Sequence, residues 1–155
     1  MEVKAKLSGG EFVHNVQFTN KDRYYEIKCQ DDSGEEKGFV NFAISRTNGY
    51  RSIWLYKIQT YEQYQHQGVG SALLSAMEYF AYIQNISLIE GKYYPDNQFA
   101  EPFYEKYGYS IYSEDYFTGV GKRIDFEKFE QETLPNINTS QFTILDDPQS
   151  GGEGM

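Results

Sequence analysis

The sequence is short of several residue types, and each shortage argues against a class of protein. The 155 residues contain one cysteine, Cys29, so no intramolecular disulfide can form, which fits a reducing cytoplasm. The two histidines, His14 and His66, stand far apart and lack the paired spacing of a zinc site. No apolar run approaches the roughly 18–20 residues that span a bilayer, and none follows the N-terminal lysines as in a signal peptide. We therefore expect a cytoplasmic protein with neither a metal site nor a membrane partner.

Positive charge is also scarce. The chain has 14 Lys and Arg residues against 23 Asp and Glu residues, a formal net charge of −9 at pH 7. Nucleic-acid binding depends on cationic side chains that neutralise phosphates, so this balance argues against a nucleic-acid partner. The acidity is compatible with attraction of a cationic amine or a lysine-rich protein, and equally with a role in solubility alone.

Aromatic residues, by contrast, are abundant, with 15 Tyr and 11 Phe. Tyrosine is favoured at interfaces because it offers a large amphipathic area at low entropic cost. A surface for a protein partner or a homodimer contact is therefore one interpretation. The other is a small core lined by aromatic rings.

The first 60 residues predict a sheet of mostly antiparallel strands. Alternation of apolar and polar residues indicates strands over residues 11–18, 24–29, 38–45 and 52–60. Asn48 and Gly49 form a hairpin signal before the last of these, because both residues tolerate positive φ. Residues 1–51 show no helical period long enough for a helix.

The apolar period changes after residue 60. Leu73, Leu74, Met77 and Phe80 recur at helical spacing and predict an amphipathic helix over residues 71–84. A short strand over 86–89 follows, which gives a βαβ unit with parallel strands. The remaining predicted elements are a shorter helix ending near Tyr107, strands over 109–113 and 116–124, and a helix over 126–133.

These elements predict a single α+β domain over residues 1–134 and a C-terminal tail over residues 135–155. The tail contains no Lys or Arg, and its last eight residues have the composition of a flexible segment. Within it, residues 141–145 can add an edge strand to the sheet.

The segment from Gln65 to Ser71 lies between a predicted strand and the amphipathic helix. Gly68 and Gly70 let the backbone bend so that several N–H groups converge, and the helix adds its own unpaired N–H groups. Such a loop can hold a pyrophosphate without a basic side chain, although an ordinary strand-to-helix turn has the same pattern of glycines. Leu73 stands where a dinucleotide fingerprint needs a third glycine, and no lysine follows Gly70 as a P-loop requires.

A second segment lies one helix and one strand downstream. It carries Asn97, Ala100, Tyr104, Gly108 and Tyr109. Together with the loop at 65–70, this segment resembles the two acetyl-CoA motifs of the GNAT superfamily of N-acetyltransferases. The strand over 55–60 resembles the family's fourth strand, and the resemblance covers residues 52–109.

The resemblance implies a GNAT fold and the transfer of an acetyl group from acetyl-CoA to a primary amine by direct attack. Backbone groups near Ile58 and Thr60 would bind the pantetheine amides, and Asn97 would contact the pantetheine arm. The pyrophosphate would lie on the N–H groups of Gln65, His66, Gln67, Gly68, Val69, Gly70 and Ser71, and Ser71 could also cap the helix. Tyr104 would donate a proton to the departing thiolate, although with Phe103 and Tyr107 it also resembles an aromatic core face.

Three features depart from the family's pattern. The two helices that usually follow the first strand are reduced or absent, which predicts an open acceptor site suited to a macromolecule. Residues 52–60 contain no carboxylate. The general base is therefore unassigned, and the candidates are Glu90, Glu62 and a water chain to a distant acid. Pro102 predicts that the second helix begins near that residue, which leaves Asn97 in a loop. A catalytically silent CoA-binding or protein-interaction module is the alternative to an enzyme.

Overall fold

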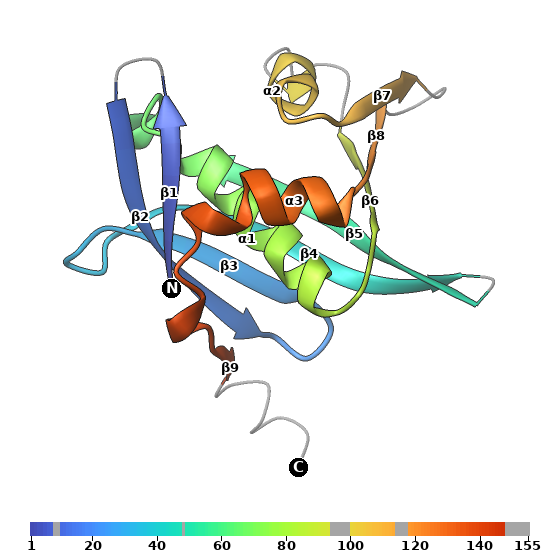
Figure 1. Cartoon of the computed structure of the whole chain (residues 1–155), viewed down its shortest axis with the longest axis horizontal. Helices are drawn as coiled ribbons and strands as arrows, with labels where there is room; N and C mark the ends of the chain where they lie inside the picture. The colour runs from blue at the N-terminus through green and yellow to red at the C-terminus, as the bar shows by residue number, and fades with distance from the viewer. Residues whose placement is uncertain (8–9, 48, 94–99, 114–117, 148–155) are drawn as a thin grey trace.

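The computed structural model describes residues 1–7, 10–47, 49–93, 100–113 and 118–147 (Figure 1). The described residues form one sheet from the strands β1 (Glu2–Leu7), β2 (Gly10–Asn20), β3 (Tyr25–Gln30), β4 (Glu36–Thr47), β5 (Tyr50–Thr60), β6 (Leu88–Tyr93), β7 (Ser110–Ser113), β8 (Thr118–Arg123) and β9 (Ile144–Asp146). The α-helices are α1 (Val69–Ile83), α2 (Ala100–Lys106) and α3 (Phe126–Glu132), and the short 3₁₀ helices are η1 (Glu62–Tyr64), η2 (Leu134–Asn136) and η3 (Thr139–Gln141).

The sheet is mixed, and most of its strand pairs are antiparallel. Its order is β1-β2-β3-β4-β5-β6-β8-β7, and β9 lies beside β2. Each neighbour from β1 to β5 is antiparallel to the next, whereas β5 and β6 are parallel because α1 carries the chain back between them. The architecture confirms the predicted α+β class and the βαβ unit. The described residues from 1 to 60 contain no helix, as the sequence indicated.

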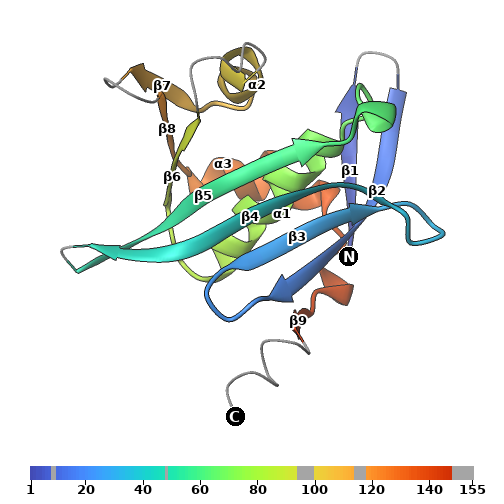
Figure 2. The same cartoon turned by 180° about the vertical axis from the view of Figure 1, so that it is seen from behind.

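Helix α1 covers one face of this sheet. Successive side chains of a strand point to opposite faces, and one set packs on α1 to form the core. The inward-facing strand residues are Val16, Phe18, Ile27, Cys29, Val40, Phe42, Ile53 and Leu55. Helix α3 packs against α1, with the rings of Phe126 and Phe129 next to Tyr82. In Figure 2, β3, β4 and β5 face the viewer, and α1 and α3 lie behind them.

The start of α1 differs from the prediction. The helix begins at Val69 rather than at residue 71, and its N-cap is Gly68, whose φ is 79°. Ser71 therefore lies inside the first turn and does not cap the helix. Glycine adopts this left-handed backbone without steric cost, which allows the helix to begin earlier than its apolar period suggests.

Strand β1 has no counterpart among the predicted strands. Among its residues whose burial is described, Val3 and Ala5 are buried and alternate with exposed Glu2 and Lys4. Alanine is depleted in strands, so the pattern is too weak to recognise before the pairing with β2 is known.

Residues 135–147 pack on the domain, in contrast to the tail expected there. Ile137 forms a bridge with Val3, and β9 pairs in parallel with Phe18 to Asn20 of β2. The edge strand expected over residues 141–145 occurs only in part, as β9 at Ile144–Asp146, and Gln141 lies in η3 instead. Because Ile137 and Phe142 contact the core, burial of their side chains favours this docking.

Candidate functional site

The site begins where β5 and β6 separate. The two strands pair at only three positions, which join Ile53 to Ile89, Trp54 to Glu90, and Leu55 to Gly91. β5 then runs on to Thr60 while β6 ends at Tyr93. The strands therefore diverge beyond Leu55, and the β5 edge facing β6 is left without a ladder partner in the described part of the chain.

A bulge lies at the same point of β5. On the β4 side, Asn41 pairs with Lys57 and Phe42 with Leu55, so Tyr56 is an extra residue. Such a bulge bends a strand and re-aims its backbone groups. Ile58 and Thr60, whose backbone groups the family resemblance implies would bind the pantetheine arm, lie on the diverging segment that follows.

The loop between η1 and α1 contains left-handed backbone of a kind found in anion-binding concavities. His66 and Gly68 have left-handed φ values of 65° and 79°, on either side of Gln67. Backbone of this kind brings successive N–H groups together, and a non-glycine residue in this region is uncommon. The N–H of Ala72 donates to the carbonyl of Gly68 at 2.9 Å as the first bond of the helix. The N–H groups of the first turn, from Val69 to Ser71, precede that bond.

Burial within this loop varies. Val69 is buried, Gln65 and His66 are exposed, and the remaining loop residues are half-buried. Val69 thus anchors the loop in the core, while Gln65 and His66 are in contact with solvent.

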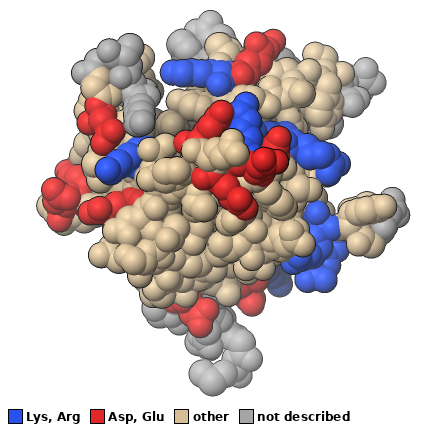
Figure 3. Space-filling model, in the orientation of Figure 1, with Lys and Arg blue, Asp and Glu red and all other residues tan. Residues whose placement is uncertain are grey.

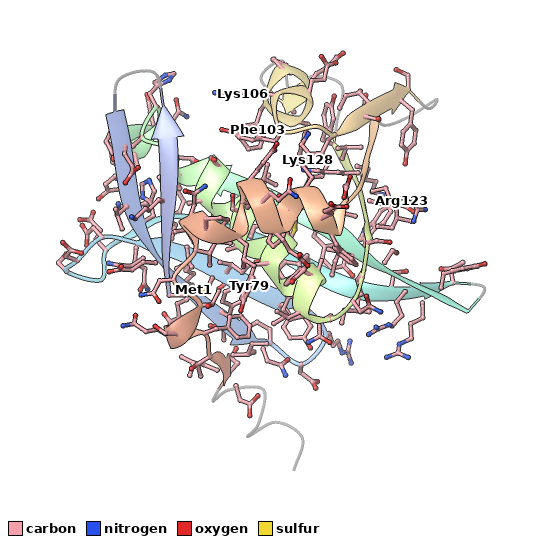
Figure 4. All side chains as sticks on the ribbon, viewed as in Figure 1. Met1, Tyr79, Phe103, Lys106, Arg123 and Lys128 are labelled. Atoms are coloured by element: carbon pink, nitrogen blue, oxygen red, sulfur yellow. The ribbon has the colours of Figure 1, made fainter. Side chains whose placement is uncertain are left out.

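Helix α2 reaches the loop through Phe103 (Figure 4). A Cβ atom on Gly70 would lie 2.8 Å from the ring of Phe103 and 3.8 Å from Oγ1 of Thr60. The end of β5, the first turn of α1 and helix α2 therefore meet at Gly70. The structure brings Thr60, the glycine loop and the neighbour of Tyr104 together, although they are far apart in the sequence.

Tyr104 is buried on α2, with 5% of its surface exposed. Its ring centroid lies 5.7 Å from those of both Tyr93 and Tyr109. Burial, with a smaller contribution from Tyr93, raises the pKa of Tyr104 to about 12. The phenol therefore keeps its proton at neutral pH. The side chain is an aromatic core residue and at the same time a protonated hydroxyl near the diverging strands.

Glu90 lies on the opposite face of the sheet. Residues paired across a ladder share a face, so Glu90 lies on the side of Trp54, and Ile89 and Tyr93 lie on the α1 side. On the Trp54 side is a cavity of about 440 Å³, lined by Arg23, Ala43, Ile44, Ser45, Trp54 and Tyr56. Glu62 is exposed on η1. Asn97 lies outside the described residues, and its expected contact stays a prediction.

Sequence reasoning overlooked His14 as a residue of this site. It is 1% exposed on β2, and its Nε2 lies 2.6 Å from the carbonyl oxygen of Gln67. The contact joins positions 53 residues apart, so no local pattern reveals it. The described residues hold no group of three or more His, Cys, Asp or Glu arranged for a metal ion. None of the helices described here combines the length and apolar character needed to cross a membrane.

The described residues define an α+β protein in which a parallel strand pair opens beside a glycine loop at a helix N-terminus. Residues 22–111 match the family model of the acetyltransferase (GNAT) domain. Since this stretch covers more than half of the chain, the protein belongs to the GNAT acetyltransferase family. Among curated proteins no significant match was found.

Solved structures share the fold. The PaiA N-acetyltransferase of Thermoplasma acidophilum, solved with coenzyme A, has a TM-score of 0.57 at 20% identity, over 64% of this chain and 60% of that chain. Naa50 of Arabidopsis thaliana, solved with the bisubstrate analogue CoA-Ac-MVNAL, has a TM-score of 0.56 at 19% identity. The match covers 64% of this chain and 72% of the Naa50 chain. A GNAT-family acetyltransferase of Streptococcus pneumoniae gives 0.55 at 23% identity, over 68% and 70%. The match thus spans three fifths of the Thermoplasma chain, and at these identities it shows the fold alone.

Proposed function

We propose that the protein is an acetyl-CoA-dependent N-acetyltransferase that transfers the acetyl group to a primary amine by direct attack in a ternary complex. The observation that carries this proposal is the free edge of β5 beyond Leu55, which leads to the loop before α1. That edge offers N–H and C=O groups in an extended row. A pantetheine arm has amides that can pair with such a row as a neighbouring strand does.

The diphosphate end of the cosubstrate fits the loop. The N–H groups from Gln65 to Ser71, with the positive end of the α1 dipole, would bind it without a cationic side chain. The acetyl end fits the bulge at Tyr56, where a re-aimed N–H would polarise the thioester carbonyl. The buried hydroxyl of Tyr93 has no hydrogen-bond partner within the described residues, and a polar group of the bound arm would supply one.

The reaction needs one proton donor and one proton acceptor. The amine nitrogen attacks the carbonyl carbon, the C–S bond breaks, and the thiolate takes the proton of Tyr104. The nitrogen loses its proton on the other side of the sheet, where Glu90 acts directly or through water. After product release, Tyr104 takes a proton from water and Glu90 gives one to water, which restores both groups for the next turnover.

The open face over β3, β4 and β5 suits a macromolecular amine. Arg23 is the charged residue in the cavity lining. Acidic side chains gather around α3, on the face shown in Figure 3, which is the α1 side of the sheet. Carboxylates on that side do not line an acceptor site over β3, β4 and β5, so we favour a peptide amine over a polyamine as the acceptor. The name of the analogue in the Naa50 structure, CoA-Ac-MVNAL, ends in a peptide sequence in one-letter code, which agrees with a peptide acceptor.

A silent CoA-binding or interaction module is the second candidate, favoured by the absence of a carboxylate on β5. Calorimetry with acetyl-CoA tests the enzyme first, because the reaction requires this ligand to bind. Consumption of acetyl-CoA in the presence of amines and peptides, with mass spectrometry of the products, then separates the enzyme from a silent CoA-binding module. Absence of binding contradicts the enzyme, and binding without turnover on any acceptor supports the silent module.

A further inference from the structure

His14 is a buried polar residue that the proposed reaction does not use. Its two ring nitrogens both have partners, Nε2 at 2.6 Å from the carbonyl oxygen of Gln67 and Nδ1 at 3.1 Å from Nζ of Lys37. The three residues come from β2, the glycine loop and β4, so the ring bridges the sheet and the loop.

The partners of the ring determine its tautomer. The ammonium of Lys37 can only donate hydrogen bonds, so Nδ1 of His14 accepts. The proton of a neutral ring then lies on Nε2 and is donated to Gln67. Burial lowers the pKa of His14 and outweighs the bond to Gln67, which raises it, while the charge of Lys37 lowers it as well. The ring is therefore neutral, with Nε2 as the donor.

The bond to Gln67 orients the next peptide group. All described peptide bonds are trans, and in a trans peptide the C=O of one residue and the N–H of the next point in opposite directions. With its carbonyl held on His14, the Gln67–Gly68 peptide directs the N–H of Gly68 away from β2. Gly68, on one side of this peptide, has a φ of 79° and lacks a side chain, so without an anchor the peptide plane could rotate.

Lys37 also holds the other end of the same connection. Its carbonyl oxygen accepts the N–H of Tyr61 at 2.9 Å, at the point where β5 ends. Its side chain, through His14, fixes Gln67 at the start of α1. One residue of β4 thus restrains both ends of the segment that carries the N–H groups.

We propose that His14, supported by Lys37, is a positioning residue of the diphosphate site: it fixes the Gln67–Gly68 peptide so that the Gly68 N–H faces the anion. The proposal rests on the proposed function and adds a residue from outside the loop. It predicts that the ring affects binding of the diphosphate, and not the chemistry at the thioester.

The test compares two ligands on four proteins. The ligands are acetyl-CoA and S-acetylpantetheine, which lacks the diphosphate, and the proteins are the wild type, His14→Phe, His14→Gln and Ile27→Val. Phenylalanine keeps the ring but has no donor, and glutamine restores a donor near Nε2. Ile27→Val is a matched change in a fully buried residue of neighbouring β3.

For His14→Phe we expect the Kd for acetyl-CoA to rise about tenfold, the effect of losing one hydrogen bond. The KM for acetyl-CoA should rise with it while kcat at saturation stays near the wild-type value. The Kd for S-acetylpantetheine should not change, His14→Gln should recover most of the affinity, and Ile27→Val should match the wild type.

Equal losses for both ligands, or an unchanged Kd for acetyl-CoA, would overturn the role of His14. If His14→Phe does not fold, His14→Ala provides the same test, because it removes the Nε2 donor to the Gln67 carbonyl without adding bulk. A wild-type protein that binds neither ligand would overturn the proposed function instead, so the two failures are distinguishable.

Discussion

Gly91 and Leu55 form the last pair of the parallel β5–β6 ladder, and they are in such close contact that a side chain on Gly91 does not fit. A Cβ atom there would lie 2.9 Å from the carbonyl oxygen and 3.0 Å from the Cβ of Leu55. Both contacts are shorter than ordinary van der Waals distances, and the first is with backbone that cannot swing aside. The place where the strands begin to diverge therefore depends on a glycine in β6.

The first prediction concerns this contact. Gly91→Ala should lower the free energy of unfolding by about 1–3 kcal/mol, because overpacking in a core forces backbone shifts. Chemical denaturation measures the change. Gly121→Ala on β8 is the matched control, since its new Cβ would lie 3.7 Å from the nearest atom, the carbonyl oxygen of Ile89. Equal losses of unfolding free energy in the two variants would show that the close contact with Leu55 does not determine the cost of a side chain at Gly91.

A second prediction follows from a buried ion pair beneath the site. Glu78 of α1 is 6% exposed and pairs with Nζ of Lys122 of β8. The same Nζ donates to the carbonyl of Tyr107 at 2.9 Å, which ties the end of α2 to α1. Burial raises the pKa of Glu78 above its ordinary 4.5, and Lys122 opposes that rise.

Lys122→Met should lower the free energy of unfolding at pH 8 by about 3 kcal/mol. This value is the low end of the range for breaking a buried ion pair by removing one partner. The lower end applies because the Lys122 side chain is 24% exposed. A carboxyl whose pKa is raised by folding stabilises the native state below its unfolded pKa, and that stability is lost as the pH rises through the folded value. The loss should therefore be smaller at pH 5 than at pH 8. Lys128→Met on the surface of α3 should show neither effect, and a pH-independent loss in Lys122→Met would contradict this account.

Much of the fold could be predicted because its signals are local. The apolar period of α1, the alternation in β3 to β5 and the turn residues all report on neighbours within a few positions. β1 and the docking of Ile137 could not be predicted, because Val3 and Ile137 are recognised as core only once they pair.

The candidate site divides in the same way. The glycine loop and the Tyr104 segment were visible as motifs. The divergence of β5 from β6 was not visible from spacing, because it depends on the contact between Gly91 and Leu55. From the sequence, His14 was considered only as a possible zinc ligand, and that possibility was dismissed. Its contact with Gln67 could not be predicted, because Gln67 is 53 residues away in another element.

The third prediction concerns Cys29, which the proposed mechanism does not use. The thiol is fully buried, and burial raises its pKa to about 11 while Lys37 lowers it slightly. Because the thiolate is the reactive form, the native protein should not react with a thiol reagent at pH 8, and the unfolded protein should react fully. Cys29→Ala should keep acetyl transfer at the wild-type rate. Loss of turnover in that variant would indicate an acyl-cysteine intermediate.

The last prediction separates the two interpretations of Tyr104. Tyr104→Phe keeps the ring packing on Tyr93 and Tyr109, so the Kd for acetyl-CoA should stay near the wild-type value. Its kcat should fall by about 10²-fold or more, the usual contribution of a positioned general acid. The fall should be largest at low pH and shrink toward the pKa of a free thiol, about 8.5, above which thiolate departs unaided.

With a pKa of about 12, Tyr104 stays protonated across this range, so the wild type should lose no activity to its ionisation. Tyr107→Phe, one turn further along, makes the same chemical change at a half-buried ring and should preserve kcat. The comparison needs kcat from pH 6 to 10 at saturating acetyl-CoA. If the pH–rate profiles of the wild type and Tyr104→Phe coincide, the hydroxyl has no part in the reaction and Tyr104 is an aromatic core residue only.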